Sequence, residues 1–166
     1  SWSERYDTHE VLIGPGSSTN PMNPSWTVLG DAGEMWNPAA DYEFAHGLAF
    51  DLGPWAGTEV RFAFHYTAAN GDIWRIDDLC VAEDATLELP PTSCTWFEDF
   101  DDVSEPALPA GWFTLPGPLD TFGSNDWKTN DYFSTSSPNA LYSSYTDDDS
   151  ITQDRYVVTP PIALPN

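Results

Sequence analysis

One segment of this 166-residue chain alternates between apolar and polar side chains with a strict period of two. In residues 59–66 every second side chain, from Val60 to Tyr66, is large and apolar, which is the pattern of a half-buried antiparallel strand. The remaining apolar runs are short and are interrupted by 15 prolines and 11 glycines, and none has the apolar period of a helix of ordinary length. The sequence therefore predicts an all-β, antiparallel sandwich of the jelly-roll type.

The other apolar runs predict further short strands, separated by turns rich in Gly, Pro, Asn and Asp. The sequence Asn70-Gly71-Asp72 predicts a hairpin-type turn after the strand at 59–66. Strands or extended segments are expected at residues 6–13, 26–29, 46–52, 74–81, 95–100, 140–145, 155–158 and 160–164.

The strand pattern stops after Val81 and begins again at Thr95. Between them lie Pro90 and Pro91, and consecutive prolines cannot occupy a central strand. The length suits a single domain with a sizeable core. We therefore expect one part at residues 1–83, a proline-containing linker at 84–94, and a second part at 95–166.

The charge balance restricts the partners of this chain. It has 27 acidic and five basic side chains, for a formal net charge of −22. Such a chain is repelled by nucleic acid and by anionic membranes, and cations are its natural partners. Eight tryptophans supply material for a packed core, which argues against disorder. No run of about 18 apolar residues and no signal segment are present, so we expect a mature soluble product or an excised piece.

Two segments place carboxylates inside apolar strand patterns. Asp77 and Asp78 lie in the run 74–81, and Glu98 and Asp99 lie in the run 96–102. A carboxylate beside a core is unfavourable unless it is paired, hydrogen-bonded or bound to a metal. Calcium takes six to eight oxygen ligands, so the two segments together predict a calcium site at these four residues. The alternative is that Asp77 and Asp78 lie at a strand end, solvated or paired with Arg75.

The two cysteines of the chain, Cys80 and Cys94, flank the linker. They are close enough in sequence to form a disulfide if the ends of the linker meet. The alternative is a buried, free Cys80 and an exposed Cys94. Nothing near either thiol suggests catalysis or metal binding, so we expect the disulfide, and with it an extracytoplasmic location.

Several segments resemble the choice-of-anchor J or cleaved-adhesin domains, which belong to the wider group of MAM-like and galactose-binding-like sandwiches. The family opens with an acidic strand and a P-x-G-W turn, reaches a W-x-x-T/S-P-x-I strand, and closes with a D-L, an A-G and an I-D-D motif. The matching residues are 97–100 (FEDF), 108–112 (LPAGW), 155–162 (RYVVTPPI), 51–64 (DL to AGTEVRFAF) and 76–79 (IDDL).

The motifs stand in an unusual order, because the closing half at 1–83 precedes the opening half at 95–166. Three arrangements account for this order. The chain is a permuted single domain, it is a piece of a tandem array cut within a repeat, or half-domains of neighbouring copies complete one another. The stiff linker favours the second and third, in which the halves are held apart.

Other candidate chemistry is weaker. His9, His46 and His65 are far apart in sequence, so we expect them at the surface or across strands rather than in a catalytic or zinc site. No serine lies in a G-x-S-x-G context, which argues against a hydrolase. The run 147–149 is expected to be a solvated acidic loop, or else a second cation site. Most of Trp26, Trp36, Trp55 and Trp127 are expected in the core, with a sugar-stacking platform as the alternative.

Together, the residues and the resemblance lead to one functional prediction and one alternative. We expect a non-enzymatic, calcium-stabilised adhesin module at the cell surface or outside the cell, and a repeating subunit of a fibre whose copies join head to tail by strand complementation. The alternative is a carbohydrate-binding or accessory module of a secreted hydrolase, with glycans as partners. Fold alone does not decide between these functions.

Overall fold

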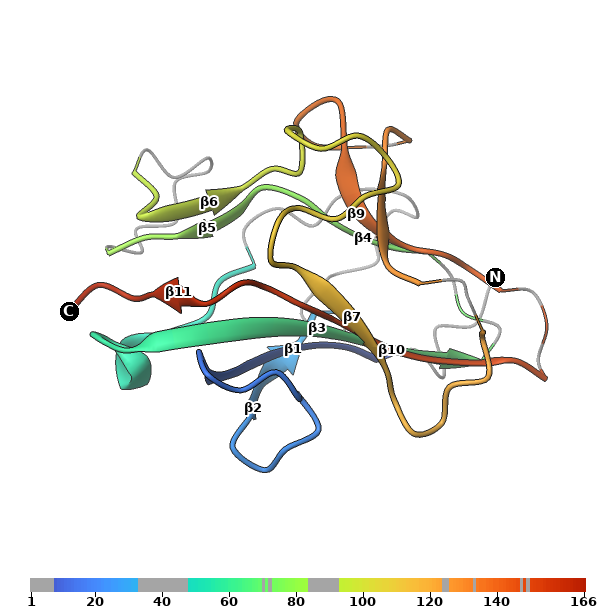
Figure 1. The fold of residues 1–166 in the computed structure, drawn as a ribbon, viewed down its shortest axis with the longest axis horizontal. Coiled ribbons are helices and arrows are strands. Elements are labelled where there is room, and N and C mark those ends of the chain that lie inside the picture. The colour runs from blue at the N-terminus through green and yellow to red at the C-terminus, as the bar shows by residue number, and fades with distance from the viewer. Residues whose placement is uncertain are drawn as a thin grey trace.

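The computed structural model describes residues 8–32, 48–69, 71, 73–83, 93–123, 126–132, 134–146, 148 and 150–166. In this part of the chain the structure is nearly all β, and its antiparallel sheets are stacked in two layers (Figure 1). The prediction of an all-β antiparallel sandwich is therefore confirmed. No helix in the described part is long and apolar enough to cross a membrane.

The first layer is a sheet centred on β3. Among the described residues it has six strands in the order β2-β1-β3-β10-β7, and β11 pairs with β3 beyond the end of β10. Its strands are β1 (Thr8–Pro15), β2 (Thr27–Asp31), β3 (Glu59–Ala69), β7 (Phe113–Pro116), β10 (Thr152–Val158) and β11 (Ile162–Ala163).

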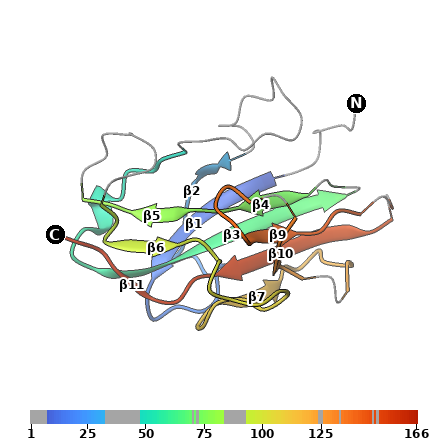
Figure 2. The ribbon, with the colours of Figure 1, turned by 90° about the horizontal axis from the view of Figure 1, so that it is seen from above.

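The second layer covers one face of the first and consists of two smaller sheets (Figure 2). One has the order β4-β9-β8 and the other pairs β5 with β6. A single turn of 3-10 helix, η1 (Gly53–Trp55), precedes β3. The strands of the second layer are β4 (Trp74–Ile76), β5 (Leu79–Val81), β6 (Trp96–Glu98), β8 (Lys128–Asn130) and β9 (Ala140–Ser143).

The core lies between the two layers, as the alternation in residues 59–66 predicts. Phe64 and Tyr66 of β3 pack with Ile76 of β4 and Leu141 of β9, while Val60 packs in a second cluster with the β5 and β6 side. Burial of such side chains supplies about 1.5–3 kcal/mol each. This apolar burial provides the main force that holds the layers together.

A smaller apolar cluster covers the outer face of the first layer. Trp26 is buried there beside Leu12 and Tyr156, and its indole Nε1–H donates to the Ser18 hydroxyl at 2.8 Å. The ring lies so close to Gly14 that a Cβ at this position would be 2.3 Å from it. Only glycine therefore allows Trp26 to close over β1.

The two halves predicted from the sequence are interleaved within one chain. β3, from the first half, pairs with β10 and β11 of the second, β4 pairs with β9, and β5 pairs with β6. The linker residues 84–92 lie outside the described residues. Its two ends are nevertheless held side by side, which differs from the expectation that the linker keeps the halves apart.

The predicted single strand at residues 74–81 is wrong. The structure divides it into β4 and β5, and the break is at Asp78, whose φ of 52° is left-handed. Asp78 adds one residue at this break, which shifts the alternation of side chains between the two faces. Ile76 and Val81 therefore both enter the core. An apolar spacing of two, three and two residues along this segment indicates a bulge of this kind. The predicted strand at 95–100 likewise ends at Glu98, and Phe100 has a φ of 61°.

Three further predictions differ from the structure. β3 and β4 lie in different sheets and do not pair with one another as the predicted hairpin requires, although residues 70 and 72 of the predicted turn lie outside the described part. Residues 48–52 form no strand, although residues 46–47 of the same prediction lie outside the described part. β8 was not predicted, because its sequence Lys-Thr-Asn carries no apolar side chain.

The P-x-G-W segment forms a tight turn. The Trp112 N–H donates to the Pro109 carbonyl at 3.1 Å, and Gly111 has a φ of 84° that favours glycine. The turn directs Trp112 into the core, where it packs edge-on against Phe100 with ring centroids 5.3 Å apart. The motif thus positions a core side chain at the start of β7.

Candidate functional site

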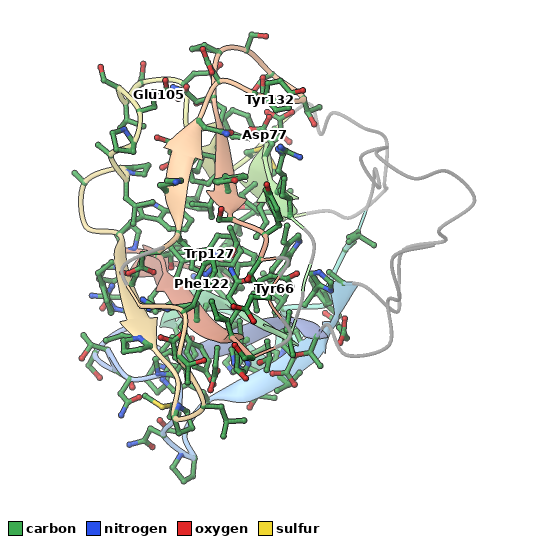
Figure 3. All side chains as sticks on the ribbon, turned by 90° about the vertical axis from the view of Figure 1, so that its right-hand side faces the viewer. Tyr66, Asp77, Glu105, Phe122, Trp127 and Tyr132 are labelled. Carbon is green, nitrogen blue, oxygen red and sulfur yellow. A yellow bond between two sulfur atoms is a disulfide. The ribbon has the colours of Figure 1, made fainter. Side chains whose placement is uncertain are left out.

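The predicted site is centred on Asp77, which lies between β4 and β5. Figure 3 shows Asp77 at the same end of the molecule as Glu105 and Tyr132. Its Oδ2 accepts hydrogen bonds from the N–H groups of Thr135 at 2.6 Å and Ser136 at 3.1 Å, and Oδ1 accepts from the N–H of Asp78 at 2.9 Å. Asp77 therefore fixes the loop before β9 to the break between β4 and β5.

Burial raises the pKa of Asp77 to about 6, from an ordinary value of 3.8. The hydrogen bond from Thr135 opposes this shift, and the neighbouring charge of Asp78 adds to it. Desolvation is therefore the larger effect, since it disfavours the charged carboxylate more than the backbone donors favour it. A cation bound nearby would act in the opposite direction and lower this pKa.

Glu98 lies at the end of β6, opposite Leu79 of β5. Its Oε1 accepts from the Phe100 N–H at 3.0 Å, and burial raises its pKa above the ordinary value of 4.5. The Trp112 indole N–H lies near this carboxylate and opposes the shift, although the two groups do not meet in hydrogen-bonding geometry. Asp99 accepts from the Asp101 N–H at 3.2 Å.

The two acidic segments are neighbours, as predicted, because β5 pairs with β6. The carboxylates of Asp77, Glu98 and Asp99 nevertheless accept hydrogen bonds from backbone N–H groups of turns and loops. In the described part of the chain, no group of three or more His, Cys, Asp and Glu side chains is arranged to hold a metal ion. Asp77, Asp78, Glu98 and Asp99 thus do not form a ready ligand set, and a calcium ion at these residues stays a prediction.

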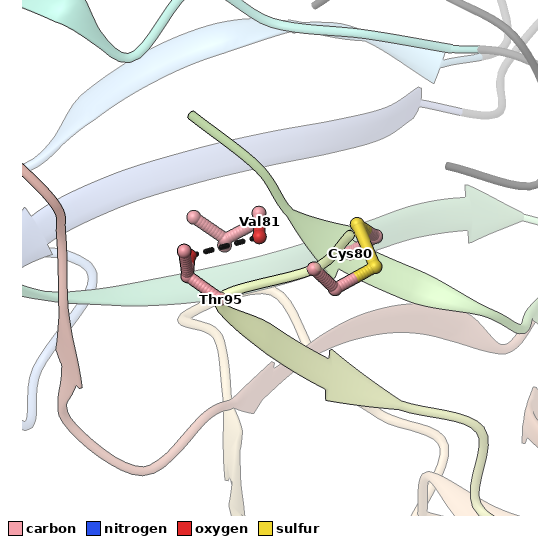
Figure 4. The surroundings of a disulfide bond; sticks show 4 residues. Cys80, Val81 and Thr95 are labelled. Carbon is pink, nitrogen blue, oxygen red and sulfur yellow. Dashed lines mark hydrogen bonds between the residues drawn. A yellow bond between two sulfur atoms is a disulfide. The ribbon is translucent and has the colours of Figure 1, made fainter. Parts of the chain in front are cut away.

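The predicted disulfide between Cys80 and Cys94 is confirmed (Figure 4). The Cα atoms are 5.5 Å apart, and the cysteines are separated by 14 positions in sequence. Beside it, the Thr95 N–H and hydroxyl both donate to the Val81 carbonyl, at 2.6 Å and 2.9 Å. The disulfide and these hydrogen bonds hold the two ends of the linker side by side.

A charge cluster that the sequence did not predict lies on the outer face of the first layer. The His65 ring nitrogens Nδ1 and Nε2 are each 2.7 Å from a carboxylate oxygen, of Glu10 and Asp154 respectively. The ring stacks on Tyr156 at 3.9 Å between centroids, and burial raises the pKa of that tyrosine to about 12. The Thr67 hydroxyl is 3.0 Å from Nε2, which gives a hydroxyl, imidazole and carboxylate in sequence.

This cluster differs from a hydrolase triad in one decisive contact. Asp154 is 3% exposed, and its Oδ1 contacts the His65 Nε2. This is the same ring nitrogen that would have to activate the Thr67 hydroxyl. A general base needs that nitrogen for its nucleophile. The other oxygen of Asp154 accepts from the Leu119 N–H at 2.8 Å. The cluster therefore joins β1, β3 and β10 to the loop that follows β7. The signal that could reveal this cluster is the cross-strand pairing of Glu10 with His65. That pairing joins residues 55 positions apart in the chain, so it is not visible as a local sequence pattern.

A second buried ion pair closes the same loop from the other side. Arg155 and Asp120 are each 7% exposed in their side chains, and the guanidinium donates to both carboxylate oxygens, at 2.9 Å and 2.7 Å. The Gly123 carbonyl also accepts from this guanidinium. Such a two-pronged pair is strong and geometrically specific.

The remaining candidates divide between core and surface. Trp26 and Trp127 are 8% and 3% exposed, so they pack in the protein as expected, whereas Trp55 is half-buried. His9 lies against the rings of Tyr66 and Trp74, each with centroids 4.9 Å away. His46, Trp36 and two residues of the acidic run, Asp147 and Asp149, lie outside the described residues. Asp148 is exposed and accepts from Ser150.

Comparison of the chain with models of known protein families, with curated proteins and with solved structures gave no match. The function is therefore argued from the arrangement of this chain's own residues.

Proposed function

We propose that this chain is an extracellular, non-enzymatic β-sandwich module with a structural or adhesive role, of the choice-of-anchor J or cleaved-adhesin kind that its motifs resemble. One observation carries the proposal. The buried and half-buried charged groups Asp77, Asp120 and Asp154 each bind a backbone N–H or an arginine from another segment. A catalytic carboxylate must keep its oxygens available to a substrate, whereas these hold loops in place. The Cys80–Cys94 disulfide supports an oxidising compartment.

The further proposal of a repeating subunit rests on what each half lacks when it stands alone. Each half alone would leave strand edges and an apolar face exposed, and such edges pair with other chains. The contacts of β3 with β10 and of β4 with β9 can in principle form between neighbouring copies. Such an exchange joins copies head to tail, and it produces a fibre unless the geometry closes a ring.

Assembly is tested on the purified chain by light scattering and negative-stain imaging across a series of calcium and salt concentrations. We expect particles larger than one chain, promoted by divalent cations or salt, because self-repulsion at a net charge of −22 opposes association. A chain that stays monomeric under every condition would contradict the fibre and leave a single permuted domain.

Calcium binding belongs to the same proposal. The raised pKa values of Asp77 and Glu98 support it, because a cation would relieve the unfavourable burial of both carboxylates. Binding to the folded chain alone stabilises by about 2.7 kcal/mol at a hundredfold excess over Kd. The Tm in millimolar calcium should therefore exceed the Tm in excess chelator, and Asp77→Asn should reduce the difference. Equal Tm values would exclude calcium as a stabilising ligand.

A carbohydrate-binding role is the second candidate. The observation that favours it is a row of tyrosine and basic side chains on the second layer, where Arg75 lies 5.8 Å from the ring centroid of Tyr132 and 5.5 Å from that of Tyr142. Binding to a glycan array without assembly would favour this role over the fibre.

A further inference from the structure

His65 of β3 lies on the outer face of the first layer, between carboxylates of the two neighbouring strands. β1 and β10 flank β3 in this layer (Figure 1), and Glu10 and Tyr156 lie directly across from His65 in the register. The ring nitrogen Nδ1 is 2.7 Å from Oε2 of Glu10, and Nε2 is 2.7 Å from Oδ1 of Asp154. We call Glu10, His65 and Asp154 the His65 cluster.

These two distances determine how many protons the ring carries. An ionised carboxylate is only an acceptor, and a neutral imidazole has one N–H and one lone pair. A neutral ring could donate to Glu10 or to Asp154, but its other nitrogen would then hold a lone pair 2.7 Å from a second acceptor. Two contacts of this length need an N–H on each nitrogen, which is the imidazolium form. The extra proton lies on the ring, because carboxylic acids are ordinarily stronger acids than imidazolium.

The uncharged neighbours of the ring do not replace this proton. The Thr67 hydroxyl, 3.0 Å from Nε2, can accept or donate, so it is compatible with either form of the ring. Tyr156 stacks on the ring and stays a neutral phenol, because burial raises the pKa of this tyrosine to about 12.

Among the described residues, the other charged side chains of the surrounding elements are already bonded or are negative. On the same face of β3, the Arg61 guanidinium donates to two backbone carbonyls. Arg155 of β10 forms an ion pair with Asp120 of the loop that follows β7. Asp31 of β2 lies opposite Glu10 in the register and adds negative charge. The proton on the imidazole is therefore the charge that offsets the carboxylates of the cluster.

The two carboxylates differ in what the loss of this proton would cost them. The Asp154 side chain is 4% exposed, and its Oδ2 also accepts from the Leu119 N–H at 2.8 Å. The Glu10 side chain is 32% exposed. A buried carboxylate without its donor is unfavourable, whereas a part-exposed one can turn to water. A neutral ring therefore keeps its N–H on Nε2, toward Asp154, and Glu10 loses its partner.

We propose that His65 is a proton-dependent contact that fastens β1 to the rest of the first layer. With the proton bound, the ring holds Glu10 and Asp154 together. As the pH rises through the range in which histidine side chains titrate, roughly pH 5 to 8, the ring keeps Asp154 and releases Glu10. In the described part of the chain β2 joins the sheet through β1 alone, so this contact acts on both strands. Its contribution to stability is present in mild acid and is lost as the pH rises.

The test compares urea denaturation midpoints of the intact oxidised chain and its variants at about pH 5.5 and about pH 8. Glu10→Gln removes the second carboxylate, and its side-chain N–H can donate to the lone pair of a neutral Nδ1. Glu83→Gln is the same chemical change at an exposed position and is the matched control. Glu10→Gln is also made in the background of His65→Gln, which carries no imidazole. Comparison at equal pH cancels the other groups that titrate, because all variants share them.

We expect Glu10→Gln to lower the midpoint by roughly 0.5 M at the lower pH and to leave it unchanged or raise it at the higher pH. In the His65→Gln background, and for Glu83→Gln, the effect should be the same at both values. Nuclear magnetic resonance of the ring nitrogens, assigned by their absence in His65→Gln, should show imidazolium at the lower pH and an Nε2–H tautomer at the higher.

Three results would each overturn the proposal: a Glu10→Gln effect that is equal at the two pH values, a pH dependence that persists without His65, or a ring that does not lose its proton between them. Circular dichroism of each variant confirms that it is folded. The contact lies within the first layer and does not depend on the proposed function, so assembly and calcium binding are tested separately from it.

Discussion

At the scale of single residues, Asp77 is a half-buried carboxylate that also fixes the loop before β9 through its hydrogen bonds. Its pKa is raised to about 6 in the folded chain, so the folded state holds the proton more tightly than the unfolded state, where the value is 3.8. Its contribution to stability is therefore greatest below the lower value and is lost as the pH rises through the higher one. Glu98, whose pKa is also raised, acts in the same direction.

This predicts the behaviour of Asp77→Asn, which stays neutral at every pH. Relative to the wild type, the variant should gain a few degrees in Tm between about pH 4 and about pH 7, because only the wild type then ionises a half-buried group. Glu83→Gln, at an exposed position, is the control and should follow the wild type. A constant Tm difference between Asp77→Asn and the wild type across this range would contradict the prediction.

The His65 cluster gives a second residue-scale prediction. Replacement of His65 by Ala leaves Glu10 and the buried Asp154 facing one another without the imidazole between them. Glu10 and Asp154 each lose a hydrogen-bond partner, which should cost about 1–3 kcal/mol, and urea denaturation can measure this loss. Addition of Asp154→Asn should recover part of the loss, since it removes the uncompensated charge. Equal stability of His65→Ala and wild type would show that the cluster contributes nothing.

At the scale of elements, the hairpin of β5 and β6 depends on its disulfide. Replacement of both Cys80 and Cys94 by Ser should lower the free energy of unfolding by about 3 kcal/mol, because the bond restricts the unfolded chain over a separation of 14 residues. Denaturant midpoints of the double variant and of the reduced wild type should agree. A midpoint equal to that of the oxidised wild type would contradict the prediction.

The strands whose side chains alternate were predictable from sequence. β3 was found at nearly its observed position, since apolar side chains at every second position are visible without a structure. β10 does not alternate, and only its last four residues, 155–158, were predicted. β8 was not, because pairing with β9 alone places its polar residues in a sheet. The break at Asp78 was missed although the spacing of the apolar residues signals it.

The candidate site was predictable only in part. The sequence identified Asp77 and Glu98 as carboxylates beside the core, and both are half-buried with raised pKa values. It did not identify their partners, because the donors to Asp77 are backbone N–H groups of residues 58 and 59 positions away. Backbone N–H donors leave no pattern in the identity of the side chains, so the sequence does not reveal them. A bound metal ion was therefore the nearest explanation for carboxylates beside the core.

At the scale of the whole molecule, neither half completes a sandwich. Residues 1–83 alone lack β10 beside β3 and β9 beside β4, and residues 93–166 lack the central strand β3. We expect each fragment, made separately under reducing conditions, to show no cooperative thermal transition, and an equimolar mixture to restore one. Cooperative unfolding of either fragment as a monomer would contradict this. The control is each fragment alone at twice its amount, so that the total quantity of protein equals that of the mixture.

The placement of β1 and β11 on β3 also determines how the molecule would respond to a pulling force. Thr8 of β1 pairs with Thr67 near one end of β3, whereas Ala163 of β11 pairs with Glu59 at the other end. Tension applied at these two points acts along the strand axes, while the interstrand hydrogen bonds lie across them. The bonds between β1 and β3 would therefore be loaded together in shear and would yield collectively, which gives the sheet high mechanical resistance along the direction from Thr8 to Ala163.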